Sequence, residues 1–148
     1  MELAKCNYPQ IADYLKDKDS VIIPVGAIEQ HGPSCSLGTD ALLADTISRR
    51  LADDLQIMRA PVLPFGVSPQ QMVFPGTISL RPETLASVFR DTYKSLYHHG
   101  FRKFFVINGH YENSLCLKGE IGEIVQAFRE TLVYLTDFWE FEKVREVM

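Results

Sequence analysis

Two short apolar runs, each followed by a polar loop, set the strongest limits on how this chain can fold. Residues 21–25 (Val-Ile-Ile-Pro-Val) and residues 104–107 (Phe-Phe-Val-Ile) read as buried strands. Segments with helical periodicity lie before, between and after them, which gives the order helix, strand, helix, strand, helix, strand, helix, strand. This order predicts a layered α/β fold in which helices flank a mostly parallel sheet.

Periodicity and boundary residues place the other elements. Asn7 is a good N-cap residue for a short first helix, and Thr39 or Asp40 would start the second. Pro82 opens the third helix and Gly100 ends it. We expect a weaker strand over 57–63, a loop over 65–76, a fourth helix over 117–128 and a last strand over 131–135. The predicted apolar faces of helices two, three and four are Leu43, Ile47, Leu51 and Leu55; Leu85, Val88, Phe89, Thr92 and Leu96; and Leu117, Ile121, Ile124, Val125 and Phe128.

Length and composition exclude several classes of protein. A chain of 148 residues is expected to form one domain, residues 1–148, with one core. The net charge of −4, with acidic and basic residues interspersed, offers no basic surface for nucleic acid. The N-terminus lacks a signal-peptide pattern and no apolar run approaches the length of a membrane span, so we expect no membrane partner and a cytoplasmic location. Cys6, Cys35 and Cys116 are odd in number and lack a Cys-x-x-Cys pair, which indicates reduced thiols.

Candidate ligand residues follow both apolar runs. Glu29 and His31 come after the first run, and His110 and Glu112 come after the second. The members of each pair are two positions apart, so in extended backbone both side chains point to the same side. Asp40 adds a carboxylate at the entrance of the predicted second helix, where a negative charge is stabilised. Because parallel sheets place sites beyond the carboxyl ends of their strands, we expect these residues to lie there.

Carboxylates and imidazoles in this arrangement are typical ligands of divalent metal ions. Five ligands from three loops suit a site with two ions, each bound by a carboxylate, a histidine and a share of Asp40, with positions left open for water. The mixture of nitrogen and oxygen favours zinc, manganese or a similar ion over calcium. The same residues could instead be capped helix ends and surface polar groups without a metal. His98 and His99 close the predicted third helix, where cationic side chains are favourable, and are interpreted as structural.

Four segments together resemble the creatininase (creatinine amidohydrolase) family. They are residues 24–33 (Pro-Val-Gly-Ala-Ile-Glu-Gln-His-Gly-Pro), 38–40 (Gly-Thr-Asp), 74–77 (Phe-Pro-Gly-Thr) and 108–113 (Asn-Gly-His-Tyr-Glu-Asn). The resemblance runs from about residue 21 to the last predicted strand and corresponds to the N-terminal and central part of the family's sequence. It implies a layered α/β fold with a dinuclear metal site.

The resemblance also implies roles for the candidate ligands. Glu29, Asp40 and His110 would hold one metal. His31, Asp40 and Glu112 would hold the other, so that Asp40 bridges the two ions. Members of the family open amide C–N bonds of small substrates, such as creatinine or formamides, by attack of water that the metals activate. They also assemble into homo-oligomers.

Three features depart from the family pattern. Ser34-Cys35-Ser36 stands where a histidine with Leu-Pro is common, and Gln70-Gln71 stands where Glu-His is common, so the expected substrate contacts differ. The family's later segment with a histidine and a glutamate has no counterpart, so we expect a C-terminally truncated chain whose catalytic acid/base is unassigned. The leading prediction is a metal-dependent amidohydrolase. The alternative is a non-catalytic metal-binding or assembly domain, either an inactive remnant or a subunit that another chain completes.

Overall fold

A computed structural model describes residues 1–128 and 130–146. The predicted alternation of helices and strands is present, with short 3₁₀ helices added between them. The elements are η1 (Leu3–Lys5), α1 (Tyr8–Asp17), β1 (Ser20–Val25), α2 (Thr39–Leu55), β2 (Met58–Arg59), η2 (Pro69–Val73), α3 (Pro82–His99), β3 (Lys103–Asn108), α4 (Asn113–Ala127), β4 (Leu132–Asp137), η3 (Phe138–Glu140) and α5 (Glu142–Arg145).

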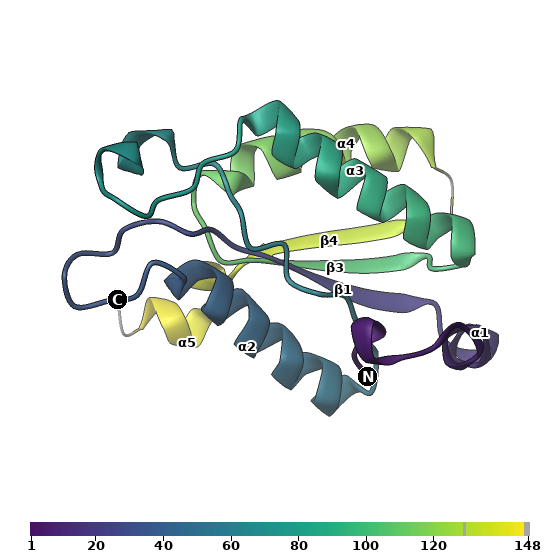
Figure 1. Ribbon diagram of the computed structural model, residues 1–148. Coiled ribbons are helices and arrows are strands. Elements are labelled where there is room, and N and C mark those ends of the chain that lie inside the picture. The colour runs from purple at the N-terminus through teal and green to yellow at the C-terminus, as the bar shows by residue number, and fades with distance from the viewer. Residues whose placement is uncertain (129, 147–148) are drawn as a thin grey trace.

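The four strands form one parallel sheet in the order β2-β1-β3-β4. Figure 1 shows α3 and α4 together on one face of the sheet and α2 on the other. The chain runs outward from β1 to β2 and then returns across β1 to β3, so the order reverses between β1 and β3. In open parallel sheets, ligands bind beyond the carboxyl ends of the strands at such a reversal point. The predicted layered α/β architecture is therefore confirmed, and its topology marks one place for a site.

The register aligns the ends of three strands. Val25, the last residue of β1, pairs with Asn108, the last residue of β3, and Asn108 pairs with Asp137, the last residue of β4. The loops that follow β1, β3 and β4 consequently leave the sheet at the same level. This alignment brings residues distant in sequence to one edge of the sheet.

The large core fills the space between the sheet and the α3–α4 layer. Helix α3 buries Tyr93 in addition to the predicted Leu85, Phe89 and Leu96, whereas Val88 is exposed. The Tyr93 hydroxyl donates to Thr131 Oγ1 at 3.0 Å, which gives its buried polar end a partner. On α4, Leu117 and Ile124 are buried as predicted. The prediction was wrong for Val88 and for Val125, which is also exposed.

Helix α2 packs on the opposite face with a side different from the one predicted. Its buried side chains are small ones, whereas the larger Leu43 and Leu55 are exposed and Ile47 and Leu51 are only partly buried. Small side chains let the helix backbone come close to the sheet, and this close approach determines which side faces inward. The buried residues of α2 are Asp40, Ala41, Ala44, Ser48 and Ala52.

Several boundaries differ from those predicted. The strand predicted over 57–63 contains only Met58–Arg59, and after it an isolated bridge pairs Leu63 with Val25. Pro61 and Pro64 lack the N–H that a longer ladder needs. Helix α2 has Gly38 at its N-cap instead of Thr39 or Asp40, and the loop predicted over 65–76 contains η2.

Two other helix ends follow their sequence signals, and a third differs. The Asn7 side chain accepts a hydrogen bond from the Gln10 backbone N–H, and the Gln10 side chain accepts one from the Asn7 backbone N–H, forming a capping box at α1. Gly100 ends α3 in a left-handed conformation with φ of 113°. Helix α4 begins at Asn113, before the predicted start at Leu117, because its first turn includes Leu115, which is exposed and does not continue the buried apolar face.

Two further expectations concern the whole chain. Within residues 1–128 and 130–146, no helix is both long enough and apolar enough to cross a membrane. Cys6, Cys35 and Cys116 are free, with Cys35 exposed and the other two partly buried. That these thiols are reduced stays a prediction.

Candidate metal centre

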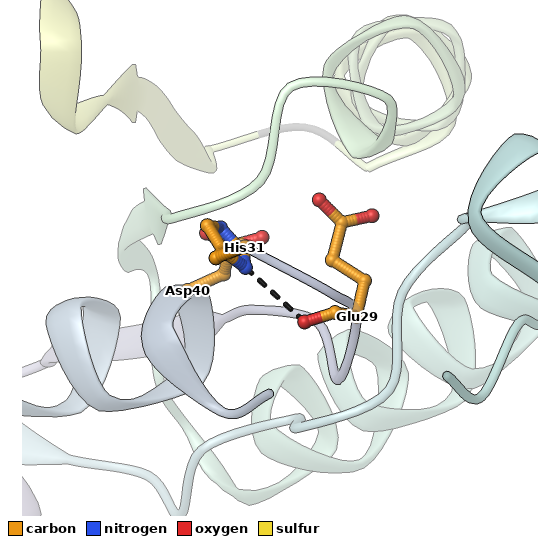
Figure 2. A group of neighbouring side chains, drawn as sticks. All are labelled: Glu29, His31 and Asp40. Atoms are coloured by element: carbon orange, nitrogen blue, oxygen red, sulfur yellow. Dashed lines mark hydrogen bonds and ion pairs between the residues drawn. The ribbon is translucent and has the colours of Figure 1, made fainter. Parts of the chain in front are cut away.

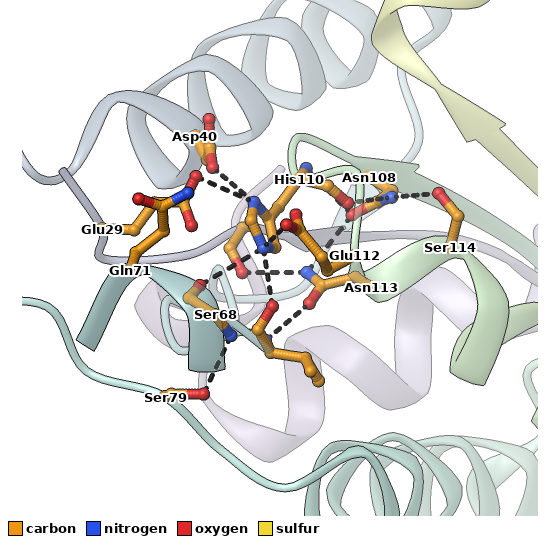
Figure 3. A network of polar contacts seen from close by, with 12 residues as sticks. Glu29, Asp40, Ser68, Gln71, Ser79, Asn108, His110, Glu112, Asn113 and Ser114 are labelled. Carbon is orange, nitrogen blue, oxygen red and sulfur yellow. Dashed lines mark hydrogen bonds and ion pairs between the residues drawn. The ribbon is translucent and has the colours of Figure 1, made fainter. Parts of the chain in front are cut away.

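The candidate centre lies where β1, β3 and α2 meet. Glu29 and His31 follow β1, His110 and Glu112 follow β3, and Asp40 is in the first turn of α2. All five predicted ligand residues come together at this edge of the sheet (Figures 2 and 3). This edge is the carboxyl end of the strands at the reversal point of the topology.

Two glycines allow α2 to begin this close to the strands. A methyl group added at Gly26, directly after β1, would overlap the backbone of Ala41, and one added at Gly109, directly after β3, would overlap the carbonyl oxygen of Asp40. Only glycine has no Cβ to obstruct such a close backbone approach. The Gly-containing turns after both strands therefore bring the Asp40 carboxylate between the two strand ends.

Asp40 lies between the two histidines and contacts both. Its Oδ1 is 3.0 Å from His31 Nε2, and its Oδ2 is 2.8 Å from His110 Nδ1. The Asp40 side chain is 8% exposed and that of His110 is 2% exposed. A carboxylate whose two oxygens face two different imidazoles has the arrangement needed to bridge two cations.

The other ring nitrogen of each histidine faces a backbone carbonyl. His31 Nδ1 lies 3.1 Å from the Glu29 carbonyl oxygen (Figure 2), and His110 Nε2 lies 2.9 Å from the Val67 carbonyl oxygen. Since a carbonyl can only accept, each of these nitrogens donates. Metal-binding histidines characteristically donate their second N–H in this way, which directs the remaining nitrogen toward the ion. Here both remaining nitrogens point at Asp40.

Glu29 and Glu112 complete the group of acidic side chains. Glu29 Oε1 is 3.5 Å from His110 Nδ1, and Glu112 Oε2 is 3.1 Å from His110 Nε2. Potential ligand atoms converge in two triads, Glu29–His31–Asp40 and Glu29–His110–Glu112. The structure thus places Glu112 nearest to Glu29 and His110, while Asp40 and Glu29 share the Nδ1 side of His110.

One buried atom shows that these residues fit a bound cation. Glu29 Oε2 is buried and has no hydrogen-bond partner within the described residues. A buried carboxylate oxygen is costly unless it is hydrogen-bonded, paired with a cation or coordinated to a metal. No lysine or arginine in residues 1–128 and 130–146 forms an ion pair with Glu29, Asp40 or Glu112. A divalent ion would satisfy both the oxygen and the charge.

The same acidic environment acts on the protonation of His110. Burial by itself lowers the pKa of its imidazole, but the hydrogen bonds to Asp40 and to the Val67 carbonyl, together with the negative charge of Glu29, raise the pKa above its ordinary value. The metal-free site therefore favours a proton on His110. A metal ion that binds a ring nitrogen of His110 displaces the proton from that nitrogen.

Comparison with known proteins agrees with this geometry. The sequence model of the creatininase family, described as creatinine amidohydrolase, matches residues 4–147. The chain belongs to the creatininase family. Creatinine amidohydrolase of Pseudomonas putida is 33% identical over 133 residues, which are 83% of this chain and 51% of that protein. The mycofactocin precursor peptide peptidase of Mycobacterium tuberculosis H37Rv is 34% identical over 113 residues, covering 70% of this chain and 45% of that protein.

A solved structure extends the comparison to three dimensions. The structure described as "Creatininase Mn" superposes with a TM-score of 0.91 at 29% identity, and the match covers 99% of this chain and 61% of that chain. This chain spans about half the length of the curated creatininase relatives that it matches. The family and the fold are therefore shown, and the activity of whole family members is not thereby assigned to this chain.

Other residues of this creatininase-family site were not found from the sequence. Ser68 is buried, and its Oγ lies 3.3 Å from His110 Nε2. Asn108 and Asn113 are also buried: Asn108 forms hydrogen bonds with the His110 backbone, and Asn113 donates to Asn108 (Figure 3). Asn108 and Asn113 lie within the motif of residues 108–113, so the motif was a signal for them. Ser68 is in an irregular loop, and no periodic pattern points to it.

A pocket of about 480 Å³ lies beside the creatininase-family centre. Glu112 forms part of its wall, and the rings of Tyr111 and Trp139 lie there with centroids 6.0 Å apart and their planes tilted by 45°. Lys118 and Glu140 add one charge of each sign. The pocket could hold a small polar molecule with a flat portion next to Glu112.

The remaining histidines lie elsewhere. His98 and His99 are exposed in the last turn of α3, which precedes the start of β3. They are therefore at the opposite edge of the sheet from the candidate centre. Their structural interpretation stays a prediction.

Proposed function

We propose that this chain supplies the metal centre of an amidohydrolase of the creatininase type, acting on the C–N bond of a small cyclic amide or a formamide. The centre would bind two divalent ions, zinc, manganese or one of each. The observation that carries the proposal is the buried, unpartnered Oε2 of Glu29 beside two histidines whose free nitrogens face a shared carboxylate. The ligands would be Glu29, His31, Asp40, His110 and Glu112.

Asp40 is the proposed bridging ligand. Its two oxygens face the two histidines, which supports one ion near His110 and one near His31. Glu29 and His110 contact each other on the Nδ1 side, in support of a set of Glu29, Asp40 and His110. His31 and Asp40 would hold the second ion, with Glu112 reaching it by rotation of a side chain that is 32% exposed.

Bound divalent ions would supply water of lowered pKa, from 15.7 toward about 7, and would polarise the amide carbonyl. The chain's own residues would do the rest. The carbonyls of Glu29 and Val67 keep the imidazoles oriented, and burial of Asp40 and His110 excludes bulk water from one side of the centre. Tyr111 and Trp139 would hold the non-reacting part of the substrate in the adjacent pocket.

Metal analysis followed by an activity screen tests the proposal. Purified protein should contain a stoichiometric divalent ion by inductively coupled plasma mass spectrometry. With zinc or manganese added, small cyclic amides and formamides should be hydrolysed, and this turnover should disappear in the His31→Ala variant. His99→Ala is the matched control because it removes a histidine at the other edge of the sheet. Absence of bound metal in the wild type contradicts the proposal.

A non-catalytic role is the second candidate, and one observation favours it. Acid catalysis needs a proton donor within hydrogen-bond reach of the leaving nitrogen. Of the four histidines in the chain, two are proposed ligands and the other two lie at the opposite edge of the sheet. No histidine is therefore left beside the centre to act as this proton donor. Metal binding without turnover of any amide in the screen would favour a metal-binding or assembly domain. Turnover that depends on His31 would exclude it.

We also propose self-association and a cytoplasmic location. The segment after β2 exposes several large apolar side chains near the candidate centre, which a second copy of the chain could cover: Phe65, Met72, Val73, Phe74 and Ile78. Three free cysteines suit a reducing compartment. Analytical ultracentrifugation tests the first proposal, and fractionation of cells tests the second.

A further inference from the structure

The backbone of His110 is held by the side chain of Asn108. Asn108 Nδ2 donates to the His110 carbonyl oxygen at 2.8 Å, and the His110 N–H donates to Asn108 Oδ1 at 3.1 Å. Asn108 is fully buried and is the last residue of β3. The side-chain amide of Asn108 thus binds both the N–H and the carbonyl oxygen of His110. These two hydrogen bonds fix the backbone position from which the imidazole extends.

Asp137 determines which way this amide points. The register pairs Asp137 with Asn108 at the ends of β4 and β3, and Asp137 Oδ1 accepts from Asn108 Nδ2 at 2.7 Å. The two ends of an amide are nearly equal in shape and differ only as donor and acceptor. Because a carboxylate only accepts, it holds the NH₂ end toward itself. The oxygen of Asn108 is then left to accept from His110.

The other hydrogen-bond and ion-pair partners of Asp137 are not proposed metal ligands, although Asp137 also lines the pocket whose wall includes Glu112. The residue is 2% exposed, and its remaining partners are Ser114 Oγ at 2.8 Å and Lys118 Nζ at 3.4 Å. No contact of Asp137 within the described residues reaches a proposed ligand side chain directly. A buried carboxylate carries a desolvation cost, and here that cost maintains the orientation of one amide.

We infer that Asp137 is a positioning residue of the metal centre. Through Asn108 it fixes the His110 backbone, so that the imidazole meets Asp40 with Nδ1 and the Val67 carbonyl with Nε2. The inference rests on the proposed function, because it assumes that His110 binds metal. Loss of a partner that orients a metal ligand typically lowers metal affinity about 10- to 100-fold.

Three substitutions at this position separate geometry from charge. Asp137→Asn keeps an acceptor oxygen in place without the charge, whereas Asp137→Glu keeps the charge but displaces the carboxylate by one methylene. By isothermal titration with Mn²⁺ or Zn²⁺, we expect Asp137→Asn to bind within about threefold of wild type, and Asp137→Glu and Asp137→Ala to bind at least about tenfold more weakly. A Glu variant that binds as tightly as the Asn variant overturns the inference. If the Ala variant does not fold, the Asn and Glu pair still decides.

A readout without metal separates this inference from the proposed function. In the metal-free protein, amide hydrogen exchange at the His110 N–H should be faster in Asp137→Glu than in wild type, and close to wild type in Asp137→Asn. Lys118→Met is the control, because it removes another donor to Asp137 and leaves the contact between Asn108 and Asp137 in place. Unchanged exchange in the Glu variant contradicts the positioning role. A wild type that binds no metal refutes the proposed function instead.

Discussion

Two groups of charged side chains in this protein differ in how their charge is balanced. The candidate metal centre brings together three carboxylates and two histidines with no lysine or arginine in ion-pair contact within the described residues. The Arg59 cluster, defined as Glu2, Asp45, Arg49 and Arg59, joins two carboxylates to two guanidinium groups. The first group has an excess of negative charge, whereas both carboxylates of the second are paired with guanidinium groups and Glu2 also contacts Lys5.

In the Arg59 cluster each carboxylate has a guanidinium partner, although Arg59 Nε is buried without a hydrogen-bond partner among the described residues. Arg49 contacts Glu2 and Asp45 at 2.8 Å each, and Arg59 donates to Asp45 from a side chain that is 6% exposed. Burial alone would raise the pKa of Asp45, but hydrogen bonds from Arg49 and Arg59 outweigh it and hold this pKa below its ordinary value. In the candidate centre, by contrast, the buried Glu29 Oε2 has neither a hydrogen-bond partner nor a lysine or arginine beside it within the described residues. The comparison teaches that the carboxylates of one group are neutralised by side chains of the chain itself, whereas those of the other are not.

Removing a proposed ligand should have the largest effect. We expect His110→Ala to lower the affinity for Zn²⁺ or Mn²⁺ at least about 100-fold, because it removes a nitrogen ligand outright, whereas loss of an outer partner alone costs about 10- to 100-fold. Isothermal titration measures the change. His98→Ala, at the other edge of the sheet, should bind as wild type does, and equal losses in both variants would refute the placement of the site.

Breaking the balanced cluster should lower stability without touching metal binding. Arg59→Met removes the buried guanidinium and leaves Asp45 short of a partner, so we expect the free energy of unfolding to fall by about 2–3 kcal/mol. Urea denaturation measures it. Arg50→Met is the control, because Arg50 pairs with Asp54 on the surface and should change stability by less than about 0.5 kcal/mol. A change in the metal affinity of Arg59→Met would contradict the expectation that the two groups act independently.

Neutralising one carboxylate in each group should have different consequences for the metal-free protein. Asp45→Asn weakens hydrogen bonds to two arginines and should destabilise the fold by about 1 kcal/mol. Asp40→Asn reduces repulsion among the unbalanced carboxylates, but it also weakens the contacts with His31 and His110 and removes a negative charge from the first turn of α2, so we expect these effects to offset and stability to stay nearly unchanged. Thermal denaturation in the presence of a chelator compares the two. Destabilisation of equal size in both variants would show that both groups are structural.

The smallest expected effect is the pH dependence of the Arg59 cluster. The pKa of Asp45 is lowered on folding, so its contribution to stability is complete above its unfolded pKa of about 3.9 and is lost as the pH falls through the folded value. The stability difference between wild type and Asp45→Asn should therefore stay constant from about pH 5 to 7 and shrink below about pH 4. Denaturant titrations across this range measure it. A difference that grows on acidification contradicts the assigned ion pairs.

The sequence predicted the elements well where a local signal was strong. The apolar runs, the Asn7 cap and Gly100 all specify structure through nearby residues, and each is where the pattern placed it. The strand over 57–63 was predicted too long because composition alone did not reveal how far its pairing with β1 extends. The inward side of α2 was assigned to leucines because the pattern weighs hydrophobicity. Small residues occupy the inward side instead, because α2 must approach Gly26 and Gly109 closely.

By itself, the sequence determined the alternation of strands and helices, the family, and the five residues proposed as ligands, since periodicity and motif are local properties. Only the tertiary structure decided which atoms face one another. It placed the two oxygens of Asp40 against two different imidazoles, left Glu29 Oε2 without a partner among the described residues, and paired Asn108 with Asp137. These contacts join residues far apart in the chain through parallel strand register and close helix packing, and neither is encoded in any single segment.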